Sequence, residues 1–314
     1  MGEFELLARI RERLPAPDSR VRLGSGDDAA ITVPAGATAT SVDALVDGVH
    51  FRRDLATPAQ IGHKALATAL SDLAAMGAKA GEAYVVLGIP TDLSEDECIE
   101  LLDGMLALAA KTGTDLAGGD LTRADSLFLA ITVVGHAASP DRLVKRSGAR
   151  PGDLLVLTGE IGGAAAGLEQ PDIEELRVRQ LEPTPRLAAG QALAESGVTA
   201  MIDVSDGLGA DAGHLAERSE VGLRIDAAAV PLAPAARELS EATGRQPWQL
   251  LGGGEDYELL ASIAPDQLEE AEQAVDEAEG IALTTIGEVV AGTGVEIRLP
   301  GGRLVEPEGF DQLA

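Results

Sequence analysis

The sequence predicts a protein of mixed α/β class built from two domains. Three observations support this prediction. The 314 residues exceed what one hydrophobic core usually holds. Patterns typical of short strands and of amphipathic helices alternate in both halves of the chain. Between residues 138 and 152 the apolar periodicity lapses into a stretch rich in Pro, Ser and Arg, which is typical of a domain boundary. We therefore expect domains over residues 1–140 and 141–314.

The first half of the chain mixes helices and strands. Apolar residues at helical spacing over residues 5–14 predict a helix that Pro15 ends. Residues 29–33 and 38–42 are short β-branched runs, and Pro34-Ala35-Gly36 between them predicts a hairpin-like turn. The expected elements that follow are an Ala/Leu-rich helix at 59–76, a strand at 84–88, a helix at 94–110 and a strand at 127–135. A capping signal around Ser94 marks the start of the second of these helices.

The second half repeats this mixture, so a second α/β domain is expected. Its strands are predicted at residues 154–157, 200–204, 222–225, 257–263, 284–290 and 295–299. Its helices are predicted at residues 185–195, 207–218, 234–243 and 265–279.

Composition excludes several classes of function. The net charge of −28 repels nucleic acid and anionic membranes, so neither is expected as a partner. No apolar run reaches the ~20 residues of a membrane helix, and the N-terminus has no signal-peptide pattern, so we expect a cytoplasmic protein. Cys98 is the only cysteine, which excludes an intrachain disulfide and a thiolate metal cluster. The scarcity of lysine beside so many carboxylates leads to the hypothesis of adaptation to a salty cytoplasm.

Aspartates recur beside small residues on apolar elements. The five motifs are Gly26-Asp27-Asp28, Ser41-Val42-Asp43, Ser71-Asp72-Leu73, Gly118-Gly119-Asp120 and Ile202-Asp203-Val204-Ser205-Asp206. A carboxylate in apolar surroundings is costly when unpaired, and Mg²⁺ takes hard oxygen ligands together with substrate phosphates. Any one motif is better explained as a turn or a helix N-cap. Five together favour a site with several Mg²⁺ ions.

Other candidate phosphate-binding features are ambiguous. The P-loop and the protein-kinase glycine loop are both absent from the sequence. Residues 159–163 could present helix amides to a phosphate, or could be a close-packed helix start. Lys145, Arg146 and Arg150 form a basic cluster at the domain boundary, which suits a nucleotide phosphate, with a solvated linker as the alternative.

Two further features of the sequence could contact a ligand. Gly252-Gly253-Gly254 precedes the acidic residues Glu255 and Asp256, so a ligand could approach the backbone there, although a tight turn would explain the same pattern. His50 beside Phe51 could face a ligand or could be structural. The sequence shows no arrangement typical of nucleophilic catalysis.

These motifs together resemble the thiamine-monophosphate kinase family, along residues 3–313. The matching motifs, in family order, are Gly26-Asp27-Asp28, Ser41-Val42-Asp43, Gly48-Val49-His50-Phe51, Ser71-Asp72-Leu73-Ala74-Ala75-Met76-Gly77, Gly118-Gly119-Asp120, residues 146–153, residues 202–208 and Gly253-Gly254-Glu255-Asp256-Tyr257-Glu258-Leu259. The resemblance implies a two-domain fold like that of aminoimidazole ribonucleotide synthetase. In it the N-terminal domain has a mixed sheet, binds ATP and metal and forms a homodimer, the C-terminal domain is α/β, and ATP binds in the dimer cleft.

The resemblance also implies the site residues and the reaction. Several Mg²⁺ ions would be held by Asp28, Ser41, Val42, Asp43, Asp72, Asp120, Asp203 and Asp206. ATP would contact Gly119, Asp120, Arg146 and Ser205, and thiamine monophosphate would contact His50, Glu255 and Phe310. Val42 stands where the family often has Thr, so any metal contact there must use the backbone carbonyl. Phe310 stands where Tyr or Trp is frequent, which keeps stacking but loses a polar contact.

The implied reaction is in-line transfer of the ATP γ-phosphoryl group to thiamine monophosphate. The acceptor is a phosphate monoester with a second pKa of ~6, so it is mostly ionised at neutral pH and needs no general base; no side chain is therefore expected to act as a chemical catalyst. Related families that use a reactive terminal cysteine do not fit the position of Cys98. A rival of another class is a non-catalytic acidic scaffold, which would bind Mg²⁺ or Ca²⁺ without nucleotide turnover.

Overall fold

The protein is described here by a computed structural model that covers residues 3–16, 20–25, 29–34, 36–244 and 246–305. The chain divides into two compact units. The N-terminal unit comprises Met1–Leu73 and Ala78–Pro140, and the C-terminal unit comprises Ala74–Gly77 and Asp141–Ala314.

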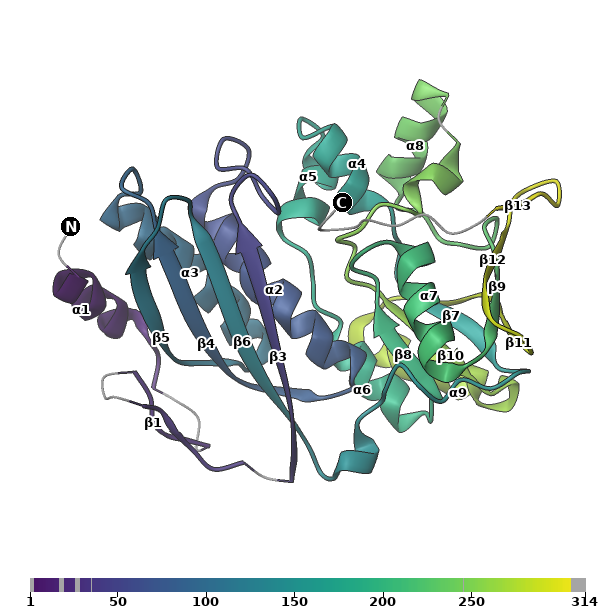
Figure 1. Cartoon of the computed structure of the whole chain (residues 1–314), viewed down its shortest axis with the longest axis horizontal. Coiled ribbons are helices and arrows are strands. Elements are labelled where there is room, and N and C mark those ends of the chain that lie inside the picture. The colour runs from purple at the N-terminus through teal and green to yellow at the C-terminus, as the bar shows by residue number, and fades with distance from the viewer. Residues whose placement is uncertain (1–2, 17–19, 26–28, 35, 245, 306–314) are drawn as a thin grey trace. The chain divides into compact units, whose positions relative to one another are not determined.

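A four-stranded sheet forms the centre of the N-terminal unit (Figure 1). Its strands are β3 (Ala37–Val46), β4 (Lys79–Ile89), β5 (Asp115–Arg123) and β6 (Phe128–Ala137), in the order β3-β6-β4-β5. β4 and β5 are parallel and the other pairs are antiparallel. Consequently β3 and β5 are the two edges of this sheet.

Among the described residues of this unit, helices cover one face of the sheet and leave the other bare. In Figure 1, α2 (Pro58–Ala75) and α3 (Glu95–Thr112) lie behind the strands, and α1 (Glu3–Arg13) lies at the β5 edge. The helices α2 and α3 cross closely, because a Cβ on Gly62 would lie 1.9 Å from the carbonyl oxygen of Leu101. The predicted cap of α3 is confirmed as a capping box between Ser94 and Glu97.

The strand residues alternate between the two faces, as the pleat requires. In β3, Ala39 and Leu45 are buried toward the helices, whereas Val42 is 65% exposed on the bare face. The pairing register extends this bare face across the sheet, through Ala130 on β6 and Val86 on β4. Thr40, Thr132 and Tyr84 also lie on this face by the register, and no helix or strand among the described residues of this unit covers it.

The hairpin expected around Pro34-Ala35-Gly36 is wrong. The strand before it, β2 (Ile31–Thr32), pairs with β1 (Val21–Leu23), and the strand after it, β3, pairs with β6. Long-range pairing along the whole of β3 therefore overrides the local turn signal.

A seven-stranded sheet forms the centre of the C-terminal unit. Its strand order is β13 (Leu304–Val305), β12 (Gly294–Arg298), β9 (Gly222–Asp226), β11 (Leu283–Val290), β7 (Leu154–Thr158), β10 (Leu259–Ile263) and β8 (Ala200–Asp203). Its helices are α4 (Gly163–Glu169), α5 (Glu174–Leu181), α6 (Leu187–Glu195), α7 (Leu208–Ser219), α8 (Pro234–Thr243) and α9 (Leu268–Glu279). In Figure 1, α7 lies in front of the sheet and α9 behind it. A core of aliphatic side chains joins α7 to the strands.

Two simple physical properties follow from these elements. Within the described part of the chain, no helix combines the length and the apolar character needed to cross a membrane. Cys98 lies buried on α3, and its burial raises the pKa of the thiol to about 11.

Candidate functional site

Three of the predicted metal ligands come together in the N-terminal unit. Ser41 and Asp43 lie on the helix-facing side of β3, and Asp72 lies on the last turns of α2. The hydroxyl of Ser41 donates a hydrogen bond to the carboxylate of Asp72. The sheet and the helix behind it thus hold these three side chains as one cluster.

The electrostatics of this cluster suit a cation. Burial raises the pKa of Asp43 above its usual value, and the negative charge of Asp72 raises it further. Hydrogen bonds from the amide of Ala44 and the hydroxyl of Thr68 act in the opposite direction, although that hydroxyl also lies 3.1 Å from the carbonyl oxygen of Ala65. Two neighbouring carboxylates repel each other when both are ionised, and a divalent cation bound between them removes this repulsion.

His50 lies in the turn that follows β3. Its Nδ1 atom accepts a hydrogen bond of 3.1 Å from the amide of Val46, and its carbonyl oxygen accepts one of 3.0 Å from the ammonium of Lys64. A positive charge on its ring would lower the pKa of Asp43. His50 therefore lies near the cluster of Ser41, Asp43 and Asp72.

Gly119 and Asp120 lie within β5, where sequence patterning did not identify a strand. They stand at one side of a pocket of about 90 Å³ between α1, α3 and the strands β4 and β5. The rest of its lining is almost wholly apolar: Leu7, Ile10, Leu14, Ser25, Val85, Leu87, Cys98, Leu101, Leu102, Met105, Leu116, Gly118 and Leu121. A flat apolar group could enter this pocket along the backbone of Gly119 and Asp120.

Asp120 does not join Asp43 within one chain. The register aligns Asp120 with Val86, Ala130 and Ala44 across the sheet, so its side chain belongs to the bare face. Asp43, next to Ala44, belongs to the helix-covered face. Three strand spacings between β3 and β5 amount to roughly 14 Å.

Predicted residues of the C-terminal unit come together on two adjoining loops. Asp203 ends β8, Ser205 and Asp206 follow, and Glu255 lies on the loop before β10. The amide of Glu255 donates to the carbonyl oxygen of Ser205 at 2.8 Å. Glycine is required here, because a Cβ on Gly254 would lie 2.2 Å from that same oxygen. Glu255 itself has the left-handed φ of 69°, which is uncommon for a residue with a side chain and marks a constrained position.

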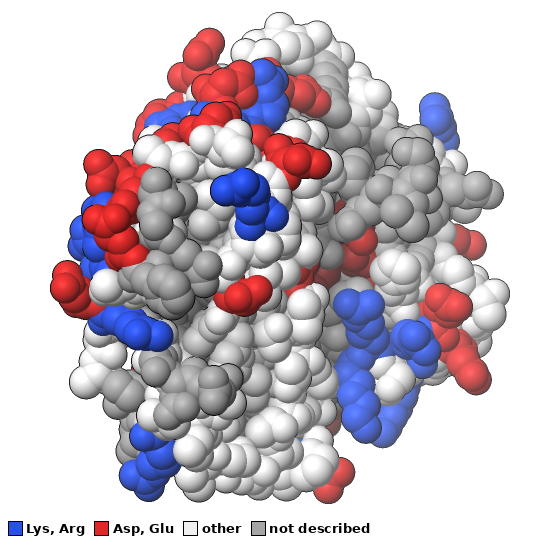
Figure 2. All heavy atoms as spheres, turned by 60° about the vertical axis from the view of Figure 1, so that its left-hand side comes forward, with Lys and Arg blue, Asp and Glu red and all other residues white. Residues whose placement is uncertain are grey.

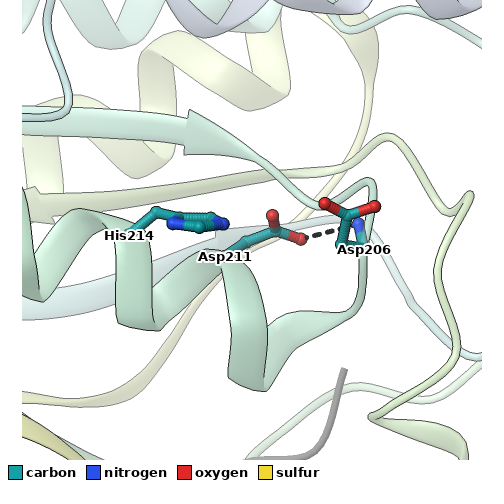
Figure 3. Close-up of side chains that lie close together, drawn as sticks. All are labelled: Asp206, Asp211 and His214. Atoms are coloured by element: carbon teal, nitrogen blue, oxygen red, sulfur yellow. Dashed lines mark hydrogen bonds between the residues drawn. The ribbon is translucent and has the colours of Figure 1, made fainter. Parts of the chain in front are cut away.

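Sequence analysis missed Asp211, which organises this loop. Its Oδ2 atom accepts hydrogen bonds of 3.0 Å from the amides of both Ser205 and Asp206. Burial and the nearby charge of Asp203 raise the pKa of Asp211 to about 7. Figure 3 shows Asp211 between Asp206 and His214, and one ligand atom from each of the three lies within 4.8 Å of the others. The i, i+3 spacing of Asp211 and His214 was the available signal, but a helical Asp in so acidic a chain resembles solvated surface.

The acidic residues that follow Gly252-Gly253-Gly254 have different roles in the structure. Asp256 accepts hydrogen bonds from the amides of Gly162 and Ala164 at the start of α4. These amides are therefore engaged within the protein, which favours a close-packed helix start over a phosphate site at residues 159–163. Glu258 is buried and pairs with Arg186, which is a structural role. Of these residues only Glu255 stays a candidate for ligand binding.

The remaining predicted residues lie elsewhere. Arg146 is exposed, and its carbonyl oxygen accepts a hydrogen bond of 2.9 Å from Ser219 at the end of α7, so its backbone lies at the opposite end of that helix from Ser205. The side chain of Val42 points to the bare face. Asp28 and Phe310 lie outside the described residues.

Comparison with known proteins agrees with this arrangement. Residues 26–137 match the N-terminal domain model of AIR synthase related proteins, and residues 150–300 match the corresponding C-terminal domain model. A thiamine-monophosphate kinase of Mycobacterium tuberculosis is 40% identical over 273 residues, which cover 83% of this chain and 80% of that protein. The chain belongs to the thiamine-monophosphate kinase family.

Solved structures of the thiamine-monophosphate kinase family have the same fold. The enzyme from Stenotrophomonas maltophilia K279a superposes with a TM-score of 0.84 at 37% identity, covering 95% of this chain and 96% of that one. AaThiL complexed with AMPPCP and TMP superposes with a TM-score of 0.79 at 31% identity, covering 98% and 96%. The two-domain, mixed α/β prediction is thus confirmed.

Proposed function

We propose that this chain transfers the γ-phosphoryl group of ATP to thiamine monophosphate, giving thiamine diphosphate and ADP. Its family membership and the complex of the related AaThiL with AMPPCP and TMP support the two substrates. The observation that carries the proposal for this chain is the convergence of Ser41, Asp43 and Asp72. An enzyme that acts on ATP would work in the cytoplasm.

The residues fit magnesium. Ser41, Asp43 and Asp72 offer hard oxygen atoms, and the mutual repulsion of the two carboxylates is the kind that a divalent cation removes. In the C-terminal unit, Asp203 and Asp206 offer further oxygens beside the buried Asp211. We assign these residues to magnesium, with Asp28, Asp120 and the carbonyl of Val42 completing the proposed set. When bound, magnesium supplies charge neutralisation for the phosphoryl group that is transferred.

The protein side chains then bind and orient the two substrates. The apolar pocket beside Gly119 and Asp120 suits the adenine ring of ATP, and Ser205 would contact a phosphate. The backbone of Arg146 is held at the other end of α7, so its guanidinium, which can bind phosphate in a bidentate way, would contact ATP at a point away from Ser205. His50, Glu255 and Phe310 would contact thiamine monophosphate. Because the acceptor phosphate is already ionised at neutral pH, binding and alignment suffice.

The bare face of the N-terminal sheet supports a homodimer. Val42 is 65% exposed there, and a sheet face that exposes large apolar side chains is usually covered by a partner. We propose that a second copy of the chain covers it. Asp120 belongs to this bare face and so lies at the proposed dimer interface, and we propose that it contributes there to the site of the partner subunit.

One assay tests the function directly. The purified protein is incubated with ATP, Mg²⁺ and thiamine monophosphate, and ADP and thiamine diphosphate are both quantified. Equal amounts of the two products are expected, and neither should form when EDTA is present. Thiamine in place of its monophosphate is the matched acceptor control. ADP release that does not depend on thiamine monophosphate, or Mg²⁺ binding without any turnover, would contradict the proposal.

A further inference from the structure

Lys64 is a buried cation next to the proposed substrate-binding histidine. Only 1% of its surface is exposed, and it lies on helix α2. Its Nζ atom donates a hydrogen bond of 3.0 Å to the carbonyl oxygen of His50. A buried ammonium is costly unless it is well hydrogen-bonded. A lysine at this position therefore requires an explanation beyond helix formation.

The helix α2 presents three polar side chains along one face. Lys64, Thr68 and Asp72 are spaced by four residues, so they lie above one another on the helix. Asp72 contacts Ser41 on β3, Thr68 contacts Asp43 two residues further along β3, and Lys64 contacts His50 in the turn after β3. One rigid helix thus sets the positions of the proposed metal ligands and of the turn that carries His50.

The hydrogen bonds of His50 determine what its ring can offer. A backbone amide can only donate, so the Nδ1 atom that accepts from Val46 carries no proton. In the neutral imidazole the proton is then on Nε2. The turn is closed further by the bond from the amide of His50 to the carbonyl oxygen of Val46 at 3.0 Å. The Nε2–H group of His50 is therefore its hydrogen-bond donor, and the hydrogen bonds of the turn fix the direction in which this group points.

We propose that Lys64 is a positioning residue for the acceptor substrate. By holding the carbonyl oxygen of His50, its ammonium fixes the backbone from which the ring is directed, and so keeps Nε2–H aligned with a hydrogen-bond acceptor on the substrate. This inference rests on the proposed function, because His50 is assigned to thiamine monophosphate there. ATP, assigned to other residues, should be affected little.

Steady-state kinetics separate this role from a general loss of stability. The test variant is Lys64→Met, which keeps a similar length and removes the donor. We expect its KM for thiamine monophosphate to rise about tenfold, as for the loss of one charge-assisted hydrogen bond, with the KM for ATP changed less than about twofold. In a His50→Ala background the same change should add nothing, because the two residues act through one contact. Lys79→Met, which removes an exposed lysine of the same unit, is the matched control.

Equal increases in both KM values, or an unchanged KM for thiamine monophosphate in folded Lys64→Met, would overturn the proposal. If Lys64→Met does not fold, Lys64→Arg replaces it. Arginine keeps the charge but moves the donor, so a selective but smaller rise in the KM for thiamine monophosphate is expected, and an unchanged KM would again overturn the role.

A spectroscopic measurement is independent of turnover. Long-range ¹H–¹⁵N correlation spectra of the full chain identify which ring nitrogen of His50 carries the proton, with His50→Ala used for assignment. The wild type should show Nε2–H alone, and Lys64→Met a mixture of tautomers. An unchanged spectrum in the variant would count against Lys64. Should the wild type fail to phosphorylate thiamine monophosphate, the proposed function falls, while this spectrum still decides whether Lys64 positions His50.

Discussion

The Oδ2 atom of Asp256 lies 2.8 Å from the backbone nitrogen of Gly162, a residue 94 positions earlier in the chain. Its second oxygen accepts from the amide of Ala164 at 3.2 Å. This one carboxylate therefore joins the glycine-rich loop before β10 to the first turn of α4. Glu255 precedes Asp256 in this loop, so the hydrogen bonds of Asp256 also hold Glu255 in place.

The titration of Asp256 should appear in the pH dependence of stability. Burial raises its pKa to about 7, so the folded protein retains a proton that the unfolded chain releases near pH ~4. The stability due to this group is then complete below about pH 4 and is lost as the pH rises through about 7. Asp256→Asn cannot titrate, so we expect its free energy of unfolding to fall less between pH ~5 and ~8 than that of the wild type, by about 1–2 kcal/mol. The residue is partly exposed, which limits the effect.

Urea denaturation at several pH values, in EDTA, measures this difference. Asp141→Asn, at an exposed position, is the control and should follow the wild type. Parallel pH profiles for Asp256→Asn and the wild type would show that Asp256 keeps an ordinary pKa.

Asp72→Asn should abolish most of the activity and leave the fold intact. The amide keeps the shape of the side chain and can still accept from Ser41, but it removes the negative charge that the proposed metal site needs. We expect kcat to fall at least about a hundredfold, with an unchanged circular dichroism spectrum. Asp141→Asn again serves as the matched control. Near-normal turnover in Asp72→Asn would refute the metal assignment.

Subunit mixing tests whether two chains share one site. Asp72→Asn and Asp120→Asn should each be inactive alone. If Asp120 acts in the partner's site, one of the two sites in a mixed dimer has both aspartates, so an equimolar random mixture should recover about a quarter of wild-type activity. No recovery in dimers shown by mass spectrometry to be mixed would mean that both aspartates serve the same chain's site.

A methyl group on Gly254 should disrupt the paired loops of the C-terminal unit. The added Cβ would lie 2.2 Å from the carbonyl oxygen of Ser205, so one loop must move away from the other. We expect Gly254→Ala to lose more than about 1 kcal/mol of unfolding free energy and to bind ATP more weakly. Gly213→Ala is the matched control, because its Cβ meets open space within α7 and should stabilise the protein by about 0.5–1 kcal/mol. Equal stability of the two variants would contradict the close approach.

Salt should stabilise this protein more than it does an ordinary one. The net charge is −28. The face in Figure 2 has a cluster of acidic groups with basic groups among them, a separate basic cluster and wide uncharged stretches. Screening shortens the reach of this repulsion from about 10 Å at 0.1 M to about 3 Å at 1 M salt. We expect the melting temperature to climb steeply with KCl in scanning calorimetry. A flat response would remove the hypothesis of salt adaptation.

Features with a local cause were predictable from sequence. Ser94 and Glu97 form a capping box from four consecutive residues, and the apolar face of α2 is visible in the sequence. The strand β5 was not identified, because Gly118 and Gly119 interrupt the pattern of a strand that is held by pairing with β4. The helix α5 was missed as well, since it is short and mostly polar.

The same distinction between local and long-range causes applies to the candidate site. Asp43 and Asp72 were identified as candidates from residue type and neighbours, but their proximity depends on the packing of α2 on β3. Asp211 and Lys64 received no role, because an acidic and a basic residue on helices look like surface until burial is known. The separation of Asp120 from Asp43 depends on strand order, which no local pattern reveals.

The burial of Cys98 has a practical consequence for experiments on this protein. It is the sole thiol of the chain, and a pKa of about 11 leaves almost none of it as the reactive thiolate at neutral pH. A second cysteine introduced on the surface could thus be labelled with a maleimide dye while Cys98 stays unmodified. Fluorescence energy transfer between two such labelled sites could then follow substrate-dependent movement in an otherwise native chain.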